Sequence, residues 1–475
     1  MNLYPSQYRR VAFVIVLGAL CLAFPALCTA VEGKPRLLVL TDISNEPDDE
    51  ESLVRLLVYS NEFDIEGLTA TTSTWLRSGT REDLIHRDIA AYAKVRSNLL
   101  KHAPGFPEPD QLEKVTFTGQ PGYGMALVGD GKQSPGSKHL VDVIDSSDPR
   151  PLWVTVWSGA NTLAQALWDL RASRNESDLK GAVAKLRVYA ISDQDDAGPW
   201  IRKEFPDLFY IVSPSTQDSL EYWRATWTGI SGDRYYKNGP RRWFELVDNP
   251  WLEEHVIKNH GPLGALYPRF SYIMEGDTPS FLGLVQNGLG WEVSPGYGGW
   301  GGRYVFYRPS GENRAIWTNN AESRDTVVVG DGSNVTSDPA TIWRWREHYQ
   351  HDFEARMNWC IADSFGKANH NPRPALNHDL TKNVLTLKAK SGTRVSLSAE
   401  GTTDPDGDSV RVTWWIYPEA GTIRNATLTV AEGLQTVVKL PVITEPGTVH
   451  VILQAEDSGE PHLFAYRRTV IEVAP

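Results

Sequence analysis

The sequence has 475 residues and a formal net charge of −12 at pH 7. So acidic a chain argues against nucleic acid and against an anionic membrane surface as binding partners. Its length suggests two or three domains, and Cys360 is the one cysteine beyond the first 30 residues, so the protein is expected to fold without an intramolecular disulfide.

The first 30 residues have the pattern of a secretory signal peptide. Arg9 and Arg10 precede an apolar run from Val11 to Leu27, and small residues end the segment at Ala30. The competing interpretation is a membrane anchor, but the run is short and a globular pattern follows almost at once. No later stretch of the sequence is apolar enough to span a bilayer. We therefore expect an exported, periplasmic or extracellular protein without a membrane span.

Residues 37–49, LLVLTDISNEPDD, join an apolar strand to the start of a helix. Asp42 ends the strand, and the loop after it brings Asp48 and Asp49 to the same edge of the sheet, where α/β proteins place ligands. Carboxylates gathered there repel one another, and Ca²⁺, which takes six to eight oxygen ligands, would relieve that repulsion. Acids at a helix start also cap free N–H groups, but Asp42 lies before the loop and has no capping role.

Strands and helices alternate along the rest of the first 367 residues. Strands are expected at 36–41, 63–73, 152–157, 186–192 and 208–213, and helices at 48–61, 81–100, 139–144, 162–171 and 342–353. This alternation predicts a Rossmann-like α/β fold with a mostly parallel sheet flanked by helices. The turn-rich stretches 116–138 and 276–303 are expected to form loops at a site, and 215–262 to be helical in part.

The pattern changes after a proline- and asparagine-rich linker at 368–378, which divides an α/β domain at 31–367 from a second domain at 379–475. Short alternating strands in the second domain predict a small all-β sandwich of immunoglobulin type. Its turn GTTDPDGDS contains Asp404, Asp406 and Asp408, which fit ordinary turn chemistry better than a second Ca²⁺ site.

Tryptophan is frequent, with 17 residues, and tryptophan faces can stack on sugar rings as well as fill a core. Trp414, Trp415 and Tyr417 lie in one expected strand, where side chains alternate between faces. At least one of them is therefore expected in the core, which weakens the case for a flat sugar platform there.

The stretch TDISNEPDD resembles the nucleoside hydrolase superfamily, and more closely a branch first described as cellulose-binding, nucleoside-hydrolase-like proteins with an appended β-domain. The resemblance covers roughly residues 35–300 and is strongest in this first motif. In the hydrolases the motif reads Asp-Thr-Asp, two or three small residues, then Asp-Asp. Here two extra residues precede the Asp48–Asp49 pair, and Leu40 replaces the first acid.

The resemblance implies a Ca²⁺ site and a role for each of its residues. Asp42 would ligate Ca²⁺ and remove a proton from the attacking water, and Asp49 would be a second ligand. Asp277, in MEGDTPSFL, would close the metal shell together with the backbone carbonyl of Trp157. Asp48 would bind sugar hydroxyls.

Further substrate contacts are expected around this site, from Asn45, Thr74, Trp75, Asp193, Asp195, Asp196 and Glu204. Thr74 or Ser73 stands where the family has an asparagine, and Trp75 would offer a stacking face. Glu204 matches the family's Glu-Phe-Asn segment, although Pro206 replaces the asparagine.

The acids of the segment SDQDD are an addition to the family pattern. Asp193, Asp195 and Asp196 form either a solvated acidic turn or a set of groups that bind hydroxyls or donate a proton. Gly276 stands where many hydrolases have the histidine that protonates the leaving base. The acid for the leaving group would then be Glu275 or one of these three aspartates.

Three functions compete. The first is an exported, Ca²⁺-dependent glycoside hydrolase that attacks the anomeric carbon of an oligosaccharide or glycoside with water. The second is a non-catalytic protein that binds cellulose or another polysaccharide with the same fold, and it suits the many tryptophans. The third, a nucleoside hydrolase, is weakened by the export signal and the lost substrate asparagines. Carbohydrate is the expected partner, and related hydrolases are often oligomers, but nothing in the sequence specifies a subunit interface.

Overall fold

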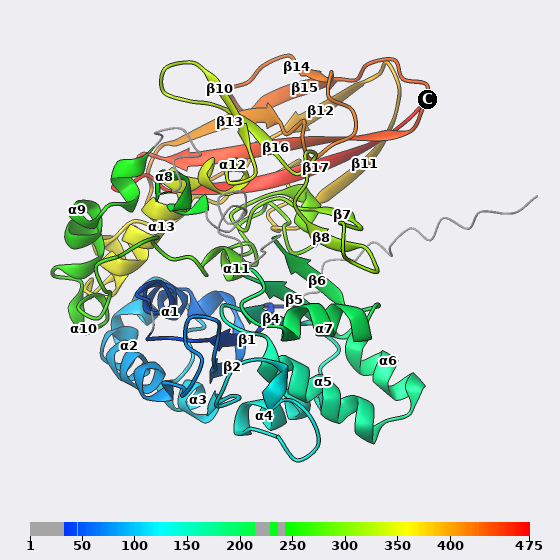
Figure 1. The fold of residues 1–475 in the computed structure, drawn as a ribbon. Coiled ribbons are helices and arrows are strands. Elements are labelled where there is room, and N and C mark those ends of the chain that lie inside the picture. Colours follow the sequence, from blue (N-terminus) through cyan, green and yellow to red (C-terminus); the bar gives the residue numbers. More distant parts are fainter. Residues whose placement is uncertain (1–32, 45, 214–228, 236–242) are drawn as a thin grey trace, which may run out of the picture.

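Figure 1 shows the fold in a computed structural model, which describes residues 33–44, 46–213, 229–235 and 243–475. The expected signal peptide and Asn45 lie outside the described residues, as does much of the segment 215–262. No helix in the described part of the chain is long and apolar enough to cross a bilayer.

An eight-stranded sheet forms the centre of the first part of the chain, in the order β3-β2-β1-β4-β5-β6-β8-β7. Its strands are β1 (Arg36–Thr41), β2 (Asp64–Ala70), β3 (Thr116–Thr118), β4 (Leu152–Val156), β5 (Leu186–Ala190), β6 (Phe209–Val212), β7 (Val305–Tyr307) and β8 (Ile316–Thr318). Every pair is parallel except β7 with β8. The predicted mostly parallel sheet is confirmed, and β1 is buried throughout, as a strand covered on both faces must be.

Helices cover both faces of this sheet (Figure 1). The longer ones are α1 (Asp48–Val58), α2 (Glu82–His102), α3 (Pro109–Lys114), α4 (Pro135–Asp145), α5 (Asn161–Ser173), α6 (Glu176–Ala184), α7 (Ala197–Glu204) and α13 (Arg346–Trp359). Short helices are α8 (Gly232–Tyr235), α9 (Asn249–Leu252), α10 (Gly261–Gly264), α11 (Pro279–Leu282) and α12 (Ala340–Trp343). Alternate residues of β1 separate the two cores: Leu37 and Val39 pack with α1 and α2, and Leu38 and Leu40 with α4 and α5.

Local hydrogen bonding explains where helices differ from their predicted bounds. Helix α4 begins at Pro135, before the predicted residue 139, because the Ser134 side chain caps the backbone N–H of Ser137 at 3.1 Å. The single helix expected at 342–353 is two helices, α12 and α13, which meet at Arg344 and Trp345.

Two sheets form the C-terminal part. A four-stranded sheet has the order β11-β17-β16-β13 and a three-stranded sheet the order β12-β15-β14, while β9 (Asp325–Val328) and β10 (Asn334–Ser337) pair separately. The strands are β11 (Leu385–Lys390), β12 (Arg394–Ser398), β13 (Val410–Ile416), β14 (Thr427–Leu428), β15 (Gln435–Lys439), β16 (Gly447–Asp457) and β17 (Phe464–Ala474). Inward residues of both sheets share one apolar core, as the predicted β-sandwich requires.

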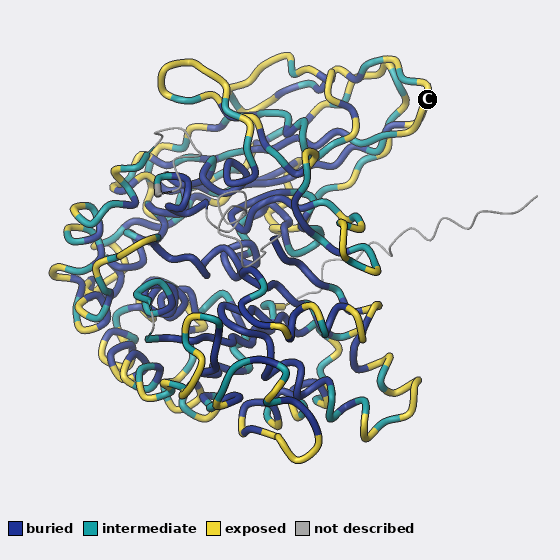
Figure 2. The backbone as a smooth tube through the Cα atoms, in the orientation of Figure 1, coloured by how far each residue is buried: buried dark blue, intermediate teal, exposed yellow. Residues whose placement is uncertain are grey.

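The two parts of the molecule are packed against each other. Ile452 and Tyr466, on the outer face of the four-stranded sheet, belong to the same buried cluster as the residues that α1 and α2 contribute. The segment 368–378, predicted as a linker, is also partly buried: Asn369 donates to the Asp457 carboxylate at 3.1 Å, and Leu376 is 1% exposed. Buried residues therefore alternate with exposed ones along this segment (Figure 2).

Candidate functional site

The carboxyl ends of β2, β1, β4 and β5 lie side by side at one edge of the sheet. In this register Leu40 pairs with Val156 and Val156 with Ala190, so the residues that follow each strand meet at the same level. Loops from β1 and β4 and the short helix α11 all reach this edge. The α/β fold thus brings chemistry-bearing side chains from distant parts of the sequence together at one site, which we call the acidic pocket after its carboxylates.

Three carboxylates converge in this pocket. Oxygen atoms of Asp48, Asp49 and Asp277 all lie within 4.8 Å of one another. Asp48 and Asp49 open α1, and Asp277 is held beside them because Ser280, in α11, donates to its backbone oxygen and accepts the indole N–H of Trp157. We refer to these three residues as the acidic cluster.

Asp42 lies next to the acidic cluster and is 4% exposed. The Ser73 hydroxyl donates to Asp42 Oδ2 at 2.5 Å, and the Thr41 hydroxyl donates to Asp49 Oδ1. Burial, opposed by the Ser73 hydrogen bond and supported by the charge of Glu46, raises the pKa of Asp42 to about 7. A carboxylate with such a pKa can both hold and release a proton near neutrality.

Burial and mutual repulsion disfavour ionisation of the whole acidic cluster. Burial first, and then the neighbouring acids, raise the pKa of Asp48 to about 7 and hold the pKa values of Asp49 and Asp277 well above their usual range. The cluster can therefore be fully ionised near neutral pH only if a cation is bound among its oxygens.

The donor set fits a hard divalent cation. Asp277 Oδ2 is buried and has no hydrogen-bond partner among the described residues, so one oxygen of the cluster is left for a ligand. All three side chains offer carboxylate oxygen, which Ca²⁺ and Mg²⁺ prefer. Gly276 makes the close approach of α1 feasible, because a Cβ at that position would lie 2.6 Å from Asp48 Oδ2.

The Trp157 carbonyl, predicted as a backbone ligand, has another partner. Gln194 Nε2 donates to it at 2.5 Å, and Trp157 N donates to Leu40 O at 2.8 Å, which fixes the strand end beside β1. A carbonyl oxygen has two lone pairs, so only the second remains for any further contact.

Two acids of the SDQDD segment have structural partners. Asp193 forms a two-pronged ion pair with Arg202 of α7, at 2.7 and 2.9 Å. Asp195 accepts the backbone N–H of Asn161 at 3.1 Å and that of Ala197 at 2.9 Å, so it caps the starts of both α5 and α7. These contacts hold both carboxylates in place, although each carboxylate oxygen keeps a second lone pair for a further contact.

Two other predicted acids also have structural partners. Glu204 lies at the far end of α7, where it forms an exposed ion pair with Arg171 at 2.8 Å. Glu275 is fully buried, pairs with Arg55 at 2.5 Å, and accepts the hydroxyl groups of Tyr267 and Thr278. Asp196 remains exposed near the pocket and accepts the backbone N–H of Met125 at 2.7 Å.

The rim of the pocket carries the remaining predicted contacts. Thr74 N donates to Gln194 O at 2.7 Å, and the next residue, Trp75, is 54% exposed. The loop after β3 contacts the strand ends, since Gly122 O accepts from both Thr72 and Asn161. As predicted for the stretch 116–138, this loop borders the site. Asn161, the first residue of α5, uses its side chain for this contact with the loop rather than to cap the helix.

Sequence reasoning did not single out Glu46 or Gln194. Glu46 lies in the enlarged loop between β1 and α1, and its charge raises the pKa values of Asp42, Asp48 and Asp277. The two extra residues of that loop are a sequence signal for it, because a longer loop can bring a further carboxylate to the pocket. Gln194 stands between conspicuous acids in SDQDD, and nothing in the sequence marks it as the one that faces Trp157.

The turn Asp404-Pro-Asp-Gly-Asp408 is a second group of acids whose oxygens lie within 4.8 Å of one another. Asp404 Oδ1 accepts the backbone N–H of Asp406 at 2.8 Å and that of Asp408 at 3.1 Å. These bonds are those of an Asx turn, and Asp404 Oδ2, like Asp277 Oδ2, is buried without a hydrogen-bond partner among the described residues.

A doubly covered parallel sheet with an acidic cluster at the carboxyl ends of its first strands defines the nucleoside hydrolase-like class. The chain belongs to the family described as "Cellulose-binding Sde182, nucleoside hydrolase-like domain", whose profile matches residues 36–304. Residues 394–473 match a second profile, described as "Cellulose-binding protein Sde0182, C-terminal domain". The predicted family is thereby confirmed.

A solved structure of the same kind supports this assignment. It is a nucleoside hydrolase-related hypothetical protein from Saccharophagus degradans, described as associated with carbohydrate metabolism, with 37% sequence identity and a TM-score of 0.79 over 93% of this chain and 100% of that one. The effector protein XOO4466 matches at 10% identity and a TM-score of 0.34, over 70% of this chain and 95% of its own. No curated protein matches the sequence.

Proposed function

We propose that the protein is an exported, divalent cation-dependent glycoside hydrolase that acts on a plant polysaccharide or one of its oligosaccharides. The cation that best suits an all-oxygen cluster of this kind is Ca²⁺. The observation that carries the proposal is the buried, unpartnered Asp277 Oδ2, which points to a ligand held together with Asp48 and Asp49. The cellulose-binding description of the family and the signal-like leader support a glycan substrate outside the cytoplasm.

In this function the acidic cluster binds the cation and Asp42 acts as the general base. When bound, a divalent cation polarises water and makes it more acidic. Asp42, whose charge acts on the cluster from beside it, would accept the proton of the attacking water as the general base. Ser73 holds the Asp42 carboxylate in one orientation through its hydrogen bond to Oδ2.

Residues at the rim of the pocket contact the substrate in this function. The exposed face of Trp75 stacks on a sugar ring, and Thr74 and Asp196 face the hydroxyl groups. Asp196 is also the leaving-group acid that remains from the predicted set, because Glu275, Asp193 and Asp195 have structural partners.

The proposal is tested with Asp42→Asn and Asp277→Asn, and with Glu204→Gln as a control in an exposed carboxylate far from the pocket. Release of nitrophenol from aryl glycosides, which need no leaving-group acid, is measured beside release of reducing sugar from cello-oligosaccharides. Loss of the general base should slow both reactions by roughly 10³-fold. Titration of EDTA-treated protein with CaCl₂ should reveal a site that is absent in Asp277→Asn and unchanged in Glu204→Gln.

Two results would contradict the proposal: full turnover by Asp42→Asn, or calcium binding that Asp277→Asn leaves intact. Thermal unfolding of each variant separates loss of function from loss of fold.

A second candidate function is polysaccharide binding without turnover. A shortage of proton donors favours this second function. Gly276 stands in place of the family's histidine, and the carboxylates of Asp193, Asp195 and Glu275 have structural partners. Release of sugar in CaCl₂, measured beside a pull-down on insoluble cellulose, distinguishes the two functions. Binding without release of any sugar by wild-type protein in CaCl₂ would identify the non-catalytic form.

A further inference from the structure

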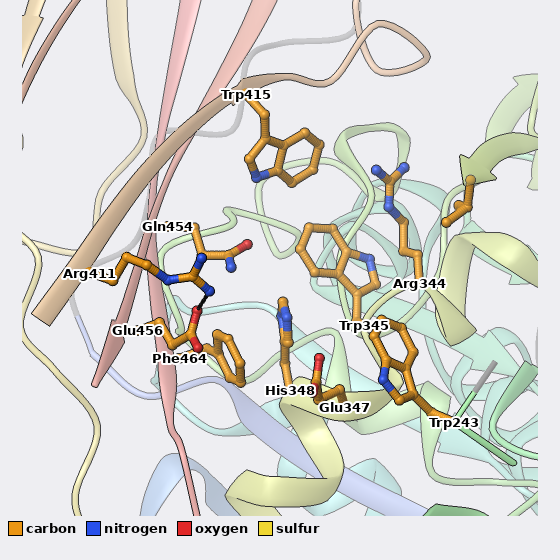
Figure 3. Close-up of a pocket in the computed structure, with 11 residues that line it drawn as sticks. Trp243, Arg344, Trp345, Glu347, His348, Arg411, Trp415, Gln454, Glu456 and Phe464 are labelled. Atoms are coloured by element: carbon orange, nitrogen blue, oxygen red, sulfur yellow. Dashed lines mark hydrogen bonds and ion pairs between the residues drawn. The ribbon is translucent and has the colours of Figure 1, made fainter. Parts of the chain in front are cut away.

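A cavity of about 350 Å³ lies between the start of α13 and the four-stranded sheet of the C-terminal part (Figure 3). It shares no lining residue with the acidic pocket. One wall comes from β13, which is the edge strand of the sheet, and from its neighbour β16. The other wall comes from the residues that join α12 to α13. We refer to this cavity as the interdomain cleft.

The strand register places charged, polar and aromatic side chains in a row along the wall formed by β13 and β16. We refer to this row as the strip. Arg411 and Trp415 lie on the same face of β13, and the antiparallel pairing sets Arg411 opposite Glu456 and Thr413 opposite Gln454. Trp414 points the other way, into the sandwich core. From Arg411 to Trp415 the strip runs about 13 Å along the strand. This length suits an extended chain of several rings.

Aromatic rings make the apolar part of the cleft. On one side of the cavity Trp415 packs against the buried Trp345, with ring centroids 5.7 Å apart and planes inclined by 43°. On the other side of the cavity the imidazole of His348 stacks on Phe464, at 3.7 Å and 20°. Figure 3 shows these rings around the central space, with the Gln454 amide directed into it. Apolar ring faces beside a planar amide are the combination that recognises a sugar ring, which has apolar C–H faces and a polar edge.

The charged groups of the cleft largely compensate one another. Arg411 forms an ion pair with Glu456, and Arg344 pairs with Asp325 at 2.8 Å while its guanidinium lies 5.0 Å from the centre of the Trp415 ring. In the lining itself Arg344 and Arg411 are matched in number by Glu347 and Glu456, so no excess charge attracts an ionic ligand, while all four groups present donors or acceptors to hydroxyl groups. The chemistry of the lining therefore selects a neutral, hydroxyl-rich ligand.

We propose that the interdomain cleft is an oligosaccharide-binding site, separate from the acidic pocket, that holds a neutral glycan chain along β13. The proposal rests on the carbohydrate-directed function proposed above and adds the place where the chain is held. Glycan bound there would keep the polysaccharide on the protein independently of cation binding or turnover at the acidic pocket.

The test is binding of cellohexaose, xylohexaose and laminarihexaose by isothermal titration to full-length protein in EDTA, so that the acidic cluster is without a cation. Trp415→Ala should weaken binding of the preferred hexasaccharide by at least about tenfold, because hot-spot aromatic residues dominate such contacts. Gln454→Met keeps the size of the side chain and removes its hydrogen bonds, and should weaken binding several-fold.

The matched control is Trp168→Ala. Trp168 is also partly buried and has an arginine near its ring, Arg171 at 5.2 Å, but it lies on α5 far from the cleft lining. This variant should bind as the wild type does. Thermal unfolding of every variant is measured in parallel, and Gln454→Met keeps the test informative if Trp415→Ala fails to fold.

Three results would overturn the proposal: wild-type protein that binds none of the hexasaccharides, wild-type affinity in both Gln454→Met and folded Trp415→Ala, or a dimer or bound peptide that occupies the cleft. Asp49→Asn separates this site from the proposed active site. Binding in EDTA that survives Asp49→Asn but not Gln454→Met supports the cleft, whatever becomes of hydrolysis. Binding lost in Asp49→Asn and kept in both cleft variants assigns the glycan to the acidic pocket alone.

Discussion

At the scale of single residues, Gly276 controls how closely the acidic cluster can form. A Cβ at this position would meet Asp48 Oδ2 at 2.6 Å and Ile273 Cδ1 at 2.8 Å. The histidine found here in many nucleoside hydrolases would therefore displace Asp48 from Asp277. The loss of this histidine and the closeness of the three carboxylates are thus two consequences of one glycine.

Gly276→Ala is accordingly expected to weaken calcium binding by about tenfold or more, because it moves a carboxylate of the cluster without removing it. Titration with CaCl₂ measures the effect. Gly181→Ala is the control, since a Cβ at Gly181 meets no atom within 4 Å. Wild-type calcium affinity in folded Gly276→Ala would show that Asp48 takes no part in the site.

At the residue scale, the sequence places Asp42, Asp48 and Asp49 at one edge of the sheet because one strand, one loop and one helix start carry all three. In the structure Asp48 and Asp49 share the acidic cluster with Asp277, and Asp42 lies beside it. The partners of Asp193 and Glu275 were not predictable, because the arginines that pair with them lie on other elements. A single sequence does not show which charges meet across a fold.

At the scale of elements, the Asp193–Arg202 ion pair ties the loop after β5 to helix α7. Arg202 also pairs with Glu312, from the segment between β7 and β8, at 2.6 Å. The side chains of Arg202 and Asp193 are only 4% and 15% exposed. Removal of the Asp193 carboxylate would leave the buried Arg202 guanidinium with Glu312 as its remaining ion-pair partner of these two.

Asp193→Ala is therefore expected to lower the free energy of unfolding by about 3 kcal/mol, measured by urea denaturation. Glu204→Ala breaks the exposed pair with Arg171 and should cost less than about 1 kcal/mol. If folded Asp193→Ala instead keeps wild-type stability and loses hydrolysis, Asp193 would be a substrate-binding acid after all.

Element types were predictable because hydrophobic periodicity records which face is buried. The strands β1, β4 and β5 read as continuous apolar runs, and the structure covers both of their faces. Helix bounds were less predictable, since they depend on caps such as Ser134. The break between α12 and α13 has no proline or glycine to mark it.

At the scale of the whole molecule, the two parts share a core that the sequence does not reveal. Proline and asparagine at 368–378 are typical of a linker, yet Ala375 and Leu376 are each 1% exposed. Tyr417 was expected either in the sandwich core or on its surface. It is fully buried at the junction, where its hydroxyl donates to Asp325. The composition of a segment shows how polar it is, but not what packs on it.

Many buried carboxyl groups give the whole molecule a pH-dependent stability. Burial raises the pKa values of Asp42, Asp48, Asp88 and Asp195 to about 7, and it is the first cause in each case. The folded state therefore retains protons that the unfolded state releases at lower pH, so ionisation near neutrality favours unfolding. Burial lowers the pKa values of buried histidines such as His450, which are thus largely neutral in both states above about pH 6.5 and do not offset this effect.

In EDTA, the free energy of unfolding is consequently expected to fall as the pH rises from about 6.5 to about 8.5. Added CaCl₂ should reverse most of the part due to the acidic cluster, and more strongly at the higher pH, because the cation takes the place of the protons. Urea denaturation at three pH values, with and without calcium, measures both effects. Asp277→Asn should abolish the calcium effect while the contribution of Asp88 and Asp195 persists. Stability that stays level or rises with pH in EDTA would mean that these carboxyl groups are already ionised in the folded protein.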